Sequence, residues 1–230
     1  MAEREAAPDR AIGATEHHLT VARDARYYLH GDPASARHAW LCCHGYGQLA
    51  SAFIGYLATE GNTDRLLVAP EALSRFYHDN GRGPVGASWM TREDRQHEID
   101  DYIRYLDQVG AELRTRLPSN HRLYALGFSQ GLATVSRWVF GGNSEVAGLI
   151  LWAGTMAPEL NPAALAPKLR GKRVALVAGS KDEYVTPDWF PREHQRFSEA
   201  GADCKDFGFH GGHRLDRVTL AQAMEFVEGG

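Results

Sequence analysis

The stretch Gly127-Phe128-Ser129-Gln130-Gly131 decides the fold, because an apolar run precedes it and a helix-like segment follows it. Residues 122–126 are typical of a buried strand, and residues 130–140 are typical of a helix. In that context the G-x-S-x-G sequence predicts a sharp strand-to-helix turn with an exposed serine hydroxyl. Glycines must flank the serine because a Cβ there would strike the neighbouring strand and helix. We expect the hydroxyl to lie in a cleft at the positive end of the helix.

Outward from this turn, strand-like and helix-like segments alternate. The expected strands are residues 17–21, 26–29, 40–43, 65–69, 122–126, 147–152, 173–178 and 203–207. The expected helices are residues 52–58, 91–117, 130–140, 188–200 and 215–227, the second starting with a capping box at Thr91. Residues 71–89 are expected to form a long loop, and residues 1–15 to be poorly ordered. The alternation predicts an α/β fold with a mostly parallel sheet and helices on both faces.

A serine at neutral pH needs a base, and the base needs a third group that orients it. His213 ends the glycine-rich segment 208–213, which follows an expected strand, and it is the candidate base. Asp182 lies just beyond the strand 173–178 and is the candidate acid. In parallel sheets, reactive groups gather beyond the carboxyl ends of the strands. The sequence therefore predicts a triad of Ser129, Asp182 and His213.

Each partner of the serine has rivals nearby. His210 is an alternative base, whereas Asp206 and Glu183 are alternative acids. Asp206 falls inside an expected strand and Glu183 falls one residue late, so Asp182 is favoured. His210 and His213 form a His-x-x-His pair, but no third ligand is apparent, so we expect no metal and no cofactor.

The segment His44-Gly45-Tyr46-Gly47 follows an early strand, where a second oxyanion-binding amide is expected. Backbone N–H groups of Tyr46 and Gln130 are predicted to bind the oxyanion of a tetrahedral intermediate. We expect His44 itself to be a structural loop residue.

Composition excludes several classes of protein. The 230 residues contain 25 Lys plus Arg and 29 Asp plus Glu, which give a formal net charge of −4. A mildly acidic chain without a basic run is a poor nucleic-acid binder. No apolar run is long enough to span a bilayer, and residues 1–15 do not read as a signal peptide. The three cysteines form no Cys-x-x-Cys pair, which favours reduced thiols in a cytoplasmic protein.

Taken together, four segments resemble the α/β-hydrolase superfamily, specifically its phospholipase/carboxylesterase (acyl-protein-thioesterase-like) family of serine esterases. The segments are Cys43-His44-Gly45-Tyr46-Gly47, Gly127-Phe128-Ser129-Gln130-Gly131, Gly179-Ser180-x-Asp182-x-x-Val185-x-Pro187 and Gly212-His213. The resemblance spans residues 39–227 and implies one α/β-hydrolase domain over residues 16–230. It also implies a serine carboxylesterase with Ser129 as nucleophile, Asp182 as acid and His213 as base. Tyr46 and Gln130 would be its oxyanion donors.

Two departures from that family bear on the substrate. Gln48 stands where the family usually has Asp or a similar group, and residues 87–91 do not match its pattern. The expected substrates are short- to medium-chain carboxylic esters, which are small molecules. The alternatives are an acyl-protein or acyl-CoA thioesterase, a lysophospholipase, and a non-catalytic hydrolase-like binding protein.

The cleft is expected to be open. The interval between the strands 147–152 and 173–178 leaves no room for a large cap domain. Aromatic residues and methionines near the strand ends are the candidate pocket walls. These are Phe76, Tyr77, Trp89, Met90, Met156, Tyr184 and Trp189.

Overall fold

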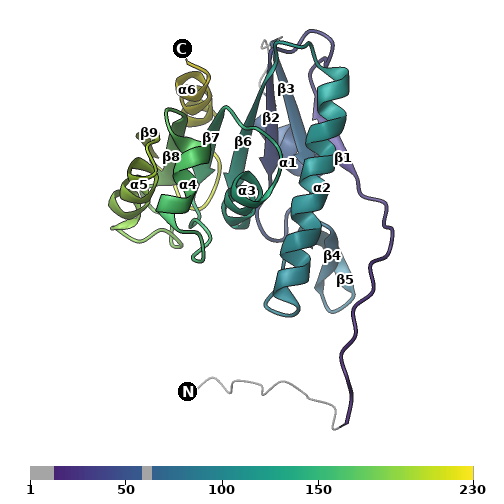
Figure 1. Cartoon of the computed structure of the whole chain (residues 1–230). Coiled ribbons are helices and arrows are strands. Elements are labelled where there is room, and N and C mark those ends of the chain that lie inside the picture. Colours follow the sequence, from purple (N-terminus) through teal and green to yellow (C-terminus); the bar gives the residue numbers. More distant parts are fainter. Residues whose placement is uncertain (1–12, 59–63, 230) are drawn as a thin grey trace.

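The computed structural model describes residues 13–58 and 64–229 (Figure 1). A seven-stranded sheet of order β1-β3-β2-β6-β7-β8-β9 forms the centre of the fold. Its strands are β1 Tyr27–His30, β2 His38–Cys43, β3 Arg65–Pro70, β6 Arg122–Phe128, β7 Gly148–Trp152, β8 Arg173–Gly179 and β9 Asp203–Phe209. β1 pairs antiparallel with β3, and the other pairs are parallel. The predicted mostly parallel sheet is therefore confirmed.

Helices cover both faces of the sheet. They are α1 Ala50–Leu57, α2 Arg95–Arg116, α3 Gln130–Gly141, α4 Pro162–Leu169, α5 Trp189–Glu199 and α6 Arg217–Glu228. Helices α2, α3, α4 and α5 pack in one apolar core, which defines the α2–α5 face. Helices α1 and α6 pack in the other core, which defines the α1/α6 face. In Figure 1, α2 and α3 lie in front of the sheet and α1 lies behind it.

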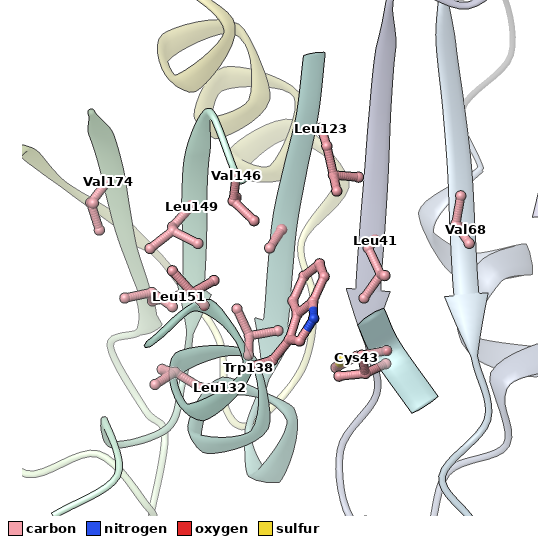
Figure 2. Close-up of a cluster of buried hydrophobic side chains, with 14 of the residues drawn as sticks. Leu41, Cys43, Val68, Leu123, Leu132, Trp138, Val146, Leu149, Leu151 and Val174 are labelled. Atoms are coloured by element: carbon pink, nitrogen blue, oxygen red, sulfur yellow. The ribbon is translucent and has the colours of Figure 1, made fainter. Parts of the chain in front are cut away.

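The central strands β2, β6 and β8 are almost entirely buried after their polar first residues, because both faces of the sheet are covered. In β6, Leu123 and Ala125 enter the core of the α2–α5 face, whereas Tyr124, Leu126 and Phe128 enter the other. Figure 2 shows the first of these cores, with Trp138 of α3 surrounded by side chains from neighbouring strands.

The adjacent cysteines of β2 obey the same alternation. Cys43 packs in the core of the α2–α5 face and Cys42 packs in the core of the α1/α6 face. Both side chains are buried and free. Because consecutive strand residues point to opposite faces, the two thiols are held apart.

The expected loop at residues 71–89 instead contains a β-hairpin. Its strands are β4 Ser74–Asp79 and β5 Arg82–Ser88, which pair antiparallel outside the main sheet. Asn80 and Gly81 connect them, with φ of 27° and 83°. Asn-Gly is a favoured hairpin turn because both residues tolerate positive φ. The prediction of a loop was therefore wrong for most of this segment.

Two other local predictions were wrong. Residues 17–21 form no strand. Helix α2 begins at Arg95, four residues after Thr91, and its N-cap Asp94 has left-handed φ and makes no side-chain cap. Thr91 instead contacts Glu98, whose carboxylate accepts from the Thr91 N–H at 2.5 Å. That longer-range hydrogen bond replaces the expected capping box.

Between β7 and β8 the chain forms one short helix, α4, in agreement with the expected absence of a large cap domain. The predicted poor order of residues 1–15 falls largely on residues 1–12, which lie outside the described part. Among the described residues, no helix is long and apolar enough to cross a membrane.

Candidate active site

Ser129 sits at the sharp turn between β6 and α3, with φ of 55° and ψ of −117°. Such a conformation is strained for a non-glycine residue and persists only where the surrounding packing enforces it. A Cβ on Gly127 would lie 2.4 Å from the Gly131 carbonyl oxygen. A Cβ on Gly131 would lie 2.1 Å from the carbonyl oxygen of Cys43. The close packing of α3 against β2 and β6 thus requires both glycines, as predicted.

The structure brings Ser129, His213 and Asp182 into one hydrogen-bonded chain. The Ser129 hydroxyl lies 2.9 Å from Nε2 of His213. Nδ1 of His213 lies 3.0 Å from Oδ1 and 2.9 Å from Oδ2 of Asp182. Because the carboxylate only accepts, Nδ1 carries the ring proton, and Nε2 is free to accept from the serine. The imidazole is therefore oriented to act as a base toward Ser129.

The hydrogen-bonded residues of the triad differ in their burial. The Asp182 side chain is fully buried, whereas that of His213 keeps 18% exposure. The backbone N–H of Tyr184 donates to Oδ1 of Asp182 at 3.0 Å. The rings of Phe128 and Tyr184 pack near the imidazole, with centroids 4.9 and 4.7 Å from it. The base is thus held in place but remains open to a ligand.

The rival residues lie elsewhere. His210 is exposed and lies 3.5 Å from the Ser180 hydroxyl, not against Ser129. Asp206 is exposed on β9 and contacts Nδ1 of His194 at 2.9 Å. Glu183 is exposed as well.

The loop after β2 presents a free backbone N–H beside the serine turn. In the described part of the chain, the Tyr46 N–H donates to no backbone or side-chain acceptor. Gln130 is the first residue of α3, so its N–H has no partner within the helix. These are the two donors that the sequence singles out, and both remain available for an anionic oxygen.

His44 holds this loop in place. Its Nε2 accepts from the Ala72 N–H at 3.1 Å, and its Nδ1 donates to the Gly45 carbonyl at 2.8 Å. Burial lowers the pKa of His44, so the ring is neutral in this position. The indole N–H of Trp89 donates to the His44 carbonyl at 2.9 Å. His44 is accordingly structural, as expected.

The β4–β5 hairpin forms backbone hydrogen bonds with the loop after β2. The Gly47 N–H donates to the Ala87 carbonyl at 2.9 Å, and the Ala87 N–H donates to the Gln48 carbonyl at 3.2 Å. The amide oxygen of Gln48 accepts from the Gly45 N–H at 2.8 Å. Gln48 therefore orders the loop from within, at the position where the sequence departs from the family pattern.

The side chain of Gln130 joins the serine turn to the segment that follows the hairpin. Its Oε1 accepts from the Trp89 N–H at 3.1 Å, and its Nε2 donates to the Met90 carbonyl at 2.9 Å. These bonds fix the start of α3 relative to the loop after β2. The backbone N–H groups of Gln130 and Tyr46 are thereby kept at fixed relative positions.

Of the seven residues expected to line the pocket, four pack in or against the core of the α2–α5 face. Trp89, Met156 and Trp189 are at most 2% exposed and belong to its core. Met90 is half-buried against that core, and Tyr184 is 72% exposed. Of the earlier candidates Phe76 and Tyr77 on β4, Phe76 stacks on the Tyr46 ring with centroids 5.1 Å apart.

A cavity of about 450 Å³ opens instead on the α1/α6 face, beside His213. Its walls are residues of α1, the hairpin, Phe128 and the segment after His213: Gly47, Gln48, Leu49, Ala52, Phe53, Tyr56, His78, Pro84, Val85, Phe128, His213, Arg214 and Leu215. Apart from His213, which was predicted as the base, sequence reasoning named none of these residues as pocket walls. The Asn80-Gly81 turn between alternating segments was the signal that could have revealed the hairpin wall.

No protein-family model matches the chain, and no curated protein sequence matches it. Solved structures do. The carboxylesterase from Mesorhizobium loti is 22% identical, with a TM-score of 0.70 over 90% of this chain and 95% of its own. Esterase PE8 is 21% identical, with a TM-score of 0.67 over 90% and 99%. Acyl-protein thioesterase 2 from Zea mays is 17% identical, with a TM-score of 0.65 over 89% and 98%. At these identities the likeness shows the fold, which is that of the α/β-hydrolases.

Proposed function

We propose that the protein is a serine carboxylesterase that acts on small carboxylic esters through an acyl-enzyme. The hydrogen-bonded chain from Ser129 through His213 to Asp182 carries the proposal. Two free backbone N–H groups beside the serine add the means to stabilise an oxyanion. The structural neighbours include proteins described as esterases and carboxylesterases, which supports the same reaction class.

The geometry suggests the order of events. Nε2 of His213 takes the proton of Ser129 while Oγ forms a bond to the ester carbonyl carbon. The carbonyl oxygen becomes negative and binds the N–H groups of Tyr46 and Gln130. The bond from that carbon to the alcohol oxygen then breaks, and Nε2 gives its proton to the leaving alkoxide. Water gives a proton to Nε2 as it bonds to the acyl carbon; the bond from that carbon to Oγ then breaks, Nε2 returns the proton to Ser129, and the acid is released.

Replacing the nucleophile tests this proposal. Ser129→Ala removes the atom that bonds the substrate, so kcat should fall on the order of 10⁶-fold. The measurement is hydrolysis of p-nitrophenyl butyrate by purified protein, with circular dichroism to show that the fold persists. A fluorophosphonate probe should label the parent at Ser129 and leave the variant unlabelled. Equal hydrolysis by both proteins would refute the assignment.

Thioester hydrolysis by the same triad is the second candidate, because one structural neighbour is described as an acyl-protein thioesterase. An oxygen ester and a thioester with the same acyl group separate the two activities. We expect the oxygen ester to have the higher kcat/KM. A reversed ratio would assign the protein to the thioesterases.

We also propose a reducing compartment such as the cytoplasm as the site of action. Cys42, Cys43 and Cys204 are all free. Free buried thiols are typical of proteins that fold where glutathione keeps cysteines reduced.

A further inference from the structure

The cavity beside His213 has mostly apolar walls. Phe53 of α1 and Phe128 of β6 form its floor, and both belong to the core of the α1/α6 face. The Tyr56 hydroxyl donates to the Leu215 carbonyl at 2.9 Å and ties α1 to the segment before α6. The volume of the cavity, about 450 Å³, falls within the range of small-molecule binding pockets.

Two of the polar side chains around this cavity, His78 and Arg214, already contact backbone carbonyls. His78 lies 3.0 Å from the Gly47 carbonyl oxygen. The Arg214 guanidinium donates to the Leu215 and His210 carbonyls and lies over the Phe209 ring. None of the residues that line the cavity is acidic. The mostly apolar walls therefore suit a neutral, apolar group, and nothing in the lining would hold a cation.

The position of His213 indicates whether the cavity receives the alcohol half or the acyl half of an ester substrate. In ester cleavage the leaving oxygen must receive its proton from Nε2, so the alcohol half extends past the histidine. His213 itself lines the cavity, together with Gly47 and Gln48 of the loop after β2. A chain leaving the alcohol oxygen enters this space directly. The acyl half must leave the carbonyl carbon in another direction, away from the imidazole.

The opposite side of the serine is packed. Met156 and Trp189 are 0% and 1% exposed in the core of the α2–α5 face. The Trp189 indole N–H donates to the Gly154 carbonyl at 2.5 Å, and a Cβ on Gly154 would lie 2.4 Å from the Ser129 carbonyl oxygen. Because Gly154 packs tightly against the backbone of the serine turn and Trp189 is held behind it, we expect little room for a large acyl group on this side.

We infer that the cavity between α1 and the hairpin binds the alcohol half of the substrate, and that the protein prefers small-acyl esters of bulky, neutral apolar alcohols. The inference rests on the proposed esterase function and specifies its substrate class. The combination of an apolar cavity bordered by the base and a packed wall across the serine carries it.

Two isomeric esters test this inference directly. Benzyl acetate places the aromatic ring in the alcohol half, whereas methyl phenylacetate places it in the acyl half. Hydrolysis is followed by pH-stat, and each kcat/KM is divided by the rate constant for hydroxide hydrolysis of the same ester. Since a well-fitting apolar group in a pocket contributes tenfold or more, the normalised ratio should favour benzyl acetate by at least about tenfold.

Filling the cavity should abolish that preference. Ala52 is exposed on α1 and lines the cavity, so Ala52→Trp places a bulky side chain in it without disturbing the core. The benzyl acetate to methyl phenylacetate ratio should fall about tenfold. Ser51→Trp is the matched control, because Ser51 is exposed on the same helix but does not line the cavity. That variant should keep the ratio of the parent.

The outcomes are distinguishable. A ratio near one in the parent, a preference for methyl phenylacetate, or an unchanged ratio in Ala52→Trp overturns the alcohol-site inference, while the esterase function stands. If neither ester is hydrolysed and a fluorophosphonate does not label Ser129, both proposals fail. Fluorophosphonate labelling of each variant also shows that its serine site remains folded.

Discussion

At the scale of single residues, the site depends on groups that have almost no freedom to move. Asp182 is fully buried, and its carboxylate receives N–H groups from His213 and Tyr184. These bonds select the tautomer of the imidazole that can accept from Ser129. Asp206, the rival acid, is exposed on β9 and is instead paired with His194 of α5. The two carboxylates therefore give a matched pair for testing.

Asp182→Asn should reduce kcat about 10⁴-fold, because the amide can donate to Nδ1 and stabilises the wrong tautomer. The change is nearly isosteric, so the fold should persist. Asp206→Asn should leave kcat at the parent level. Both variants are compared by p-nitrophenyl butyrate hydrolysis and by thermal unfolding. A large loss of kcat in Asp206→Asn alone would transfer the acid role to that residue.

At the scale of elements, the hairpin β4–β5 acts as an outer support for the loop after β2. Gly86 of β5 makes the close approach possible. A Cβ at that position would lie 2.5 Å from the Gly47 carbonyl oxygen and 2.6 Å from Nε2 of His78. The hairpin lies outside the seven-stranded sheet, and Ala87 is the one residue of its two strands that belongs to the core of the α2–α5 face, so a small displacement should cost little stability.

Gly86→Ala should therefore lower activity much more than stability. A shift of about 1 Å in the loop after β2 costs on the order of 10²-fold in kcat/KM, because the Tyr46 N–H leaves its position. Gly55→Ala is the matched control, since a Cβ on that residue of α1 meets nothing within 4 Å. It should keep the parent activity. Equal kcat/KM for parent and Gly86→Ala would show that the hairpin does not position the loop.

At the scale of the whole molecule, one ion-pair network joins segments that are distant in the chain. Glu159, in the connection between β7 and α4, lies 2.6 Å from Nε of Arg137 on α3 and 2.9 Å from Arg95 on α2. Burial raises the pKa of Glu159, but the hydrogen bonds from Arg137 and Arg95 outweigh it and hold the pKa at about 2. The Arg137 side chain is only 8% exposed, whereas that of Glu159 is 42% exposed. Solvent screening therefore moderates the contribution of the pair.

This network predicts an acid-sensitive component of stability. The folded pKa lies below the ordinary value of 4.5, so protons bind preferentially to the unfolded chain. The contribution of Glu159 is present above pH 4.5 and is lost as the pH falls toward 2. In urea unfolding experiments, Glu159→Gln should be less stable than the parent at pH 7, and the gap should narrow at pH 3. A constant gap across this range would contradict the prediction.

Sequence patterns predicted the elements whose signals are local. The apolar runs of the sheet strands reflect burial, and the glycines beside Ser129 reflect close packing of the backbone. A short window of sequence is enough to indicate both. The triad followed because Asp182 and His213 each come after a strand of one parallel sheet. The hairpin was missed although Asn80-Gly81 marked it, because its polar strands lacked the apolar runs seen elsewhere.

The pocket could not be predicted because its location depends on packing across the sheet. Trp89, Met156 and Trp189 are apolar and near strand ends, yet they fill the core of the α2–α5 face. Periodicity tells which side of a helix is buried, but it does not tell which face of the sheet that helix covers. The cavity formed on the other face, where α1 and the hairpin meet.

The two adjacent, free thiols of β2 offer a way to measure opening of the fold. Burial raises the pKa of both Cys42 and Cys43 far above the ordinary thiol range, and it raises that of Cys204 to about 11. Electrophilic reagents need the thiolate and access to it, so burial should protect Cys42 and Cys43 in the native chain. Cys42 and Cys43 face opposite layers of one central strand, so a reagent reaches both only when the sheet separates from its helices on each side. The rate at which an alkylating reagent modifies both cysteines therefore reports the global opening of the fold, and no cysteine needs to be introduced for the measurement.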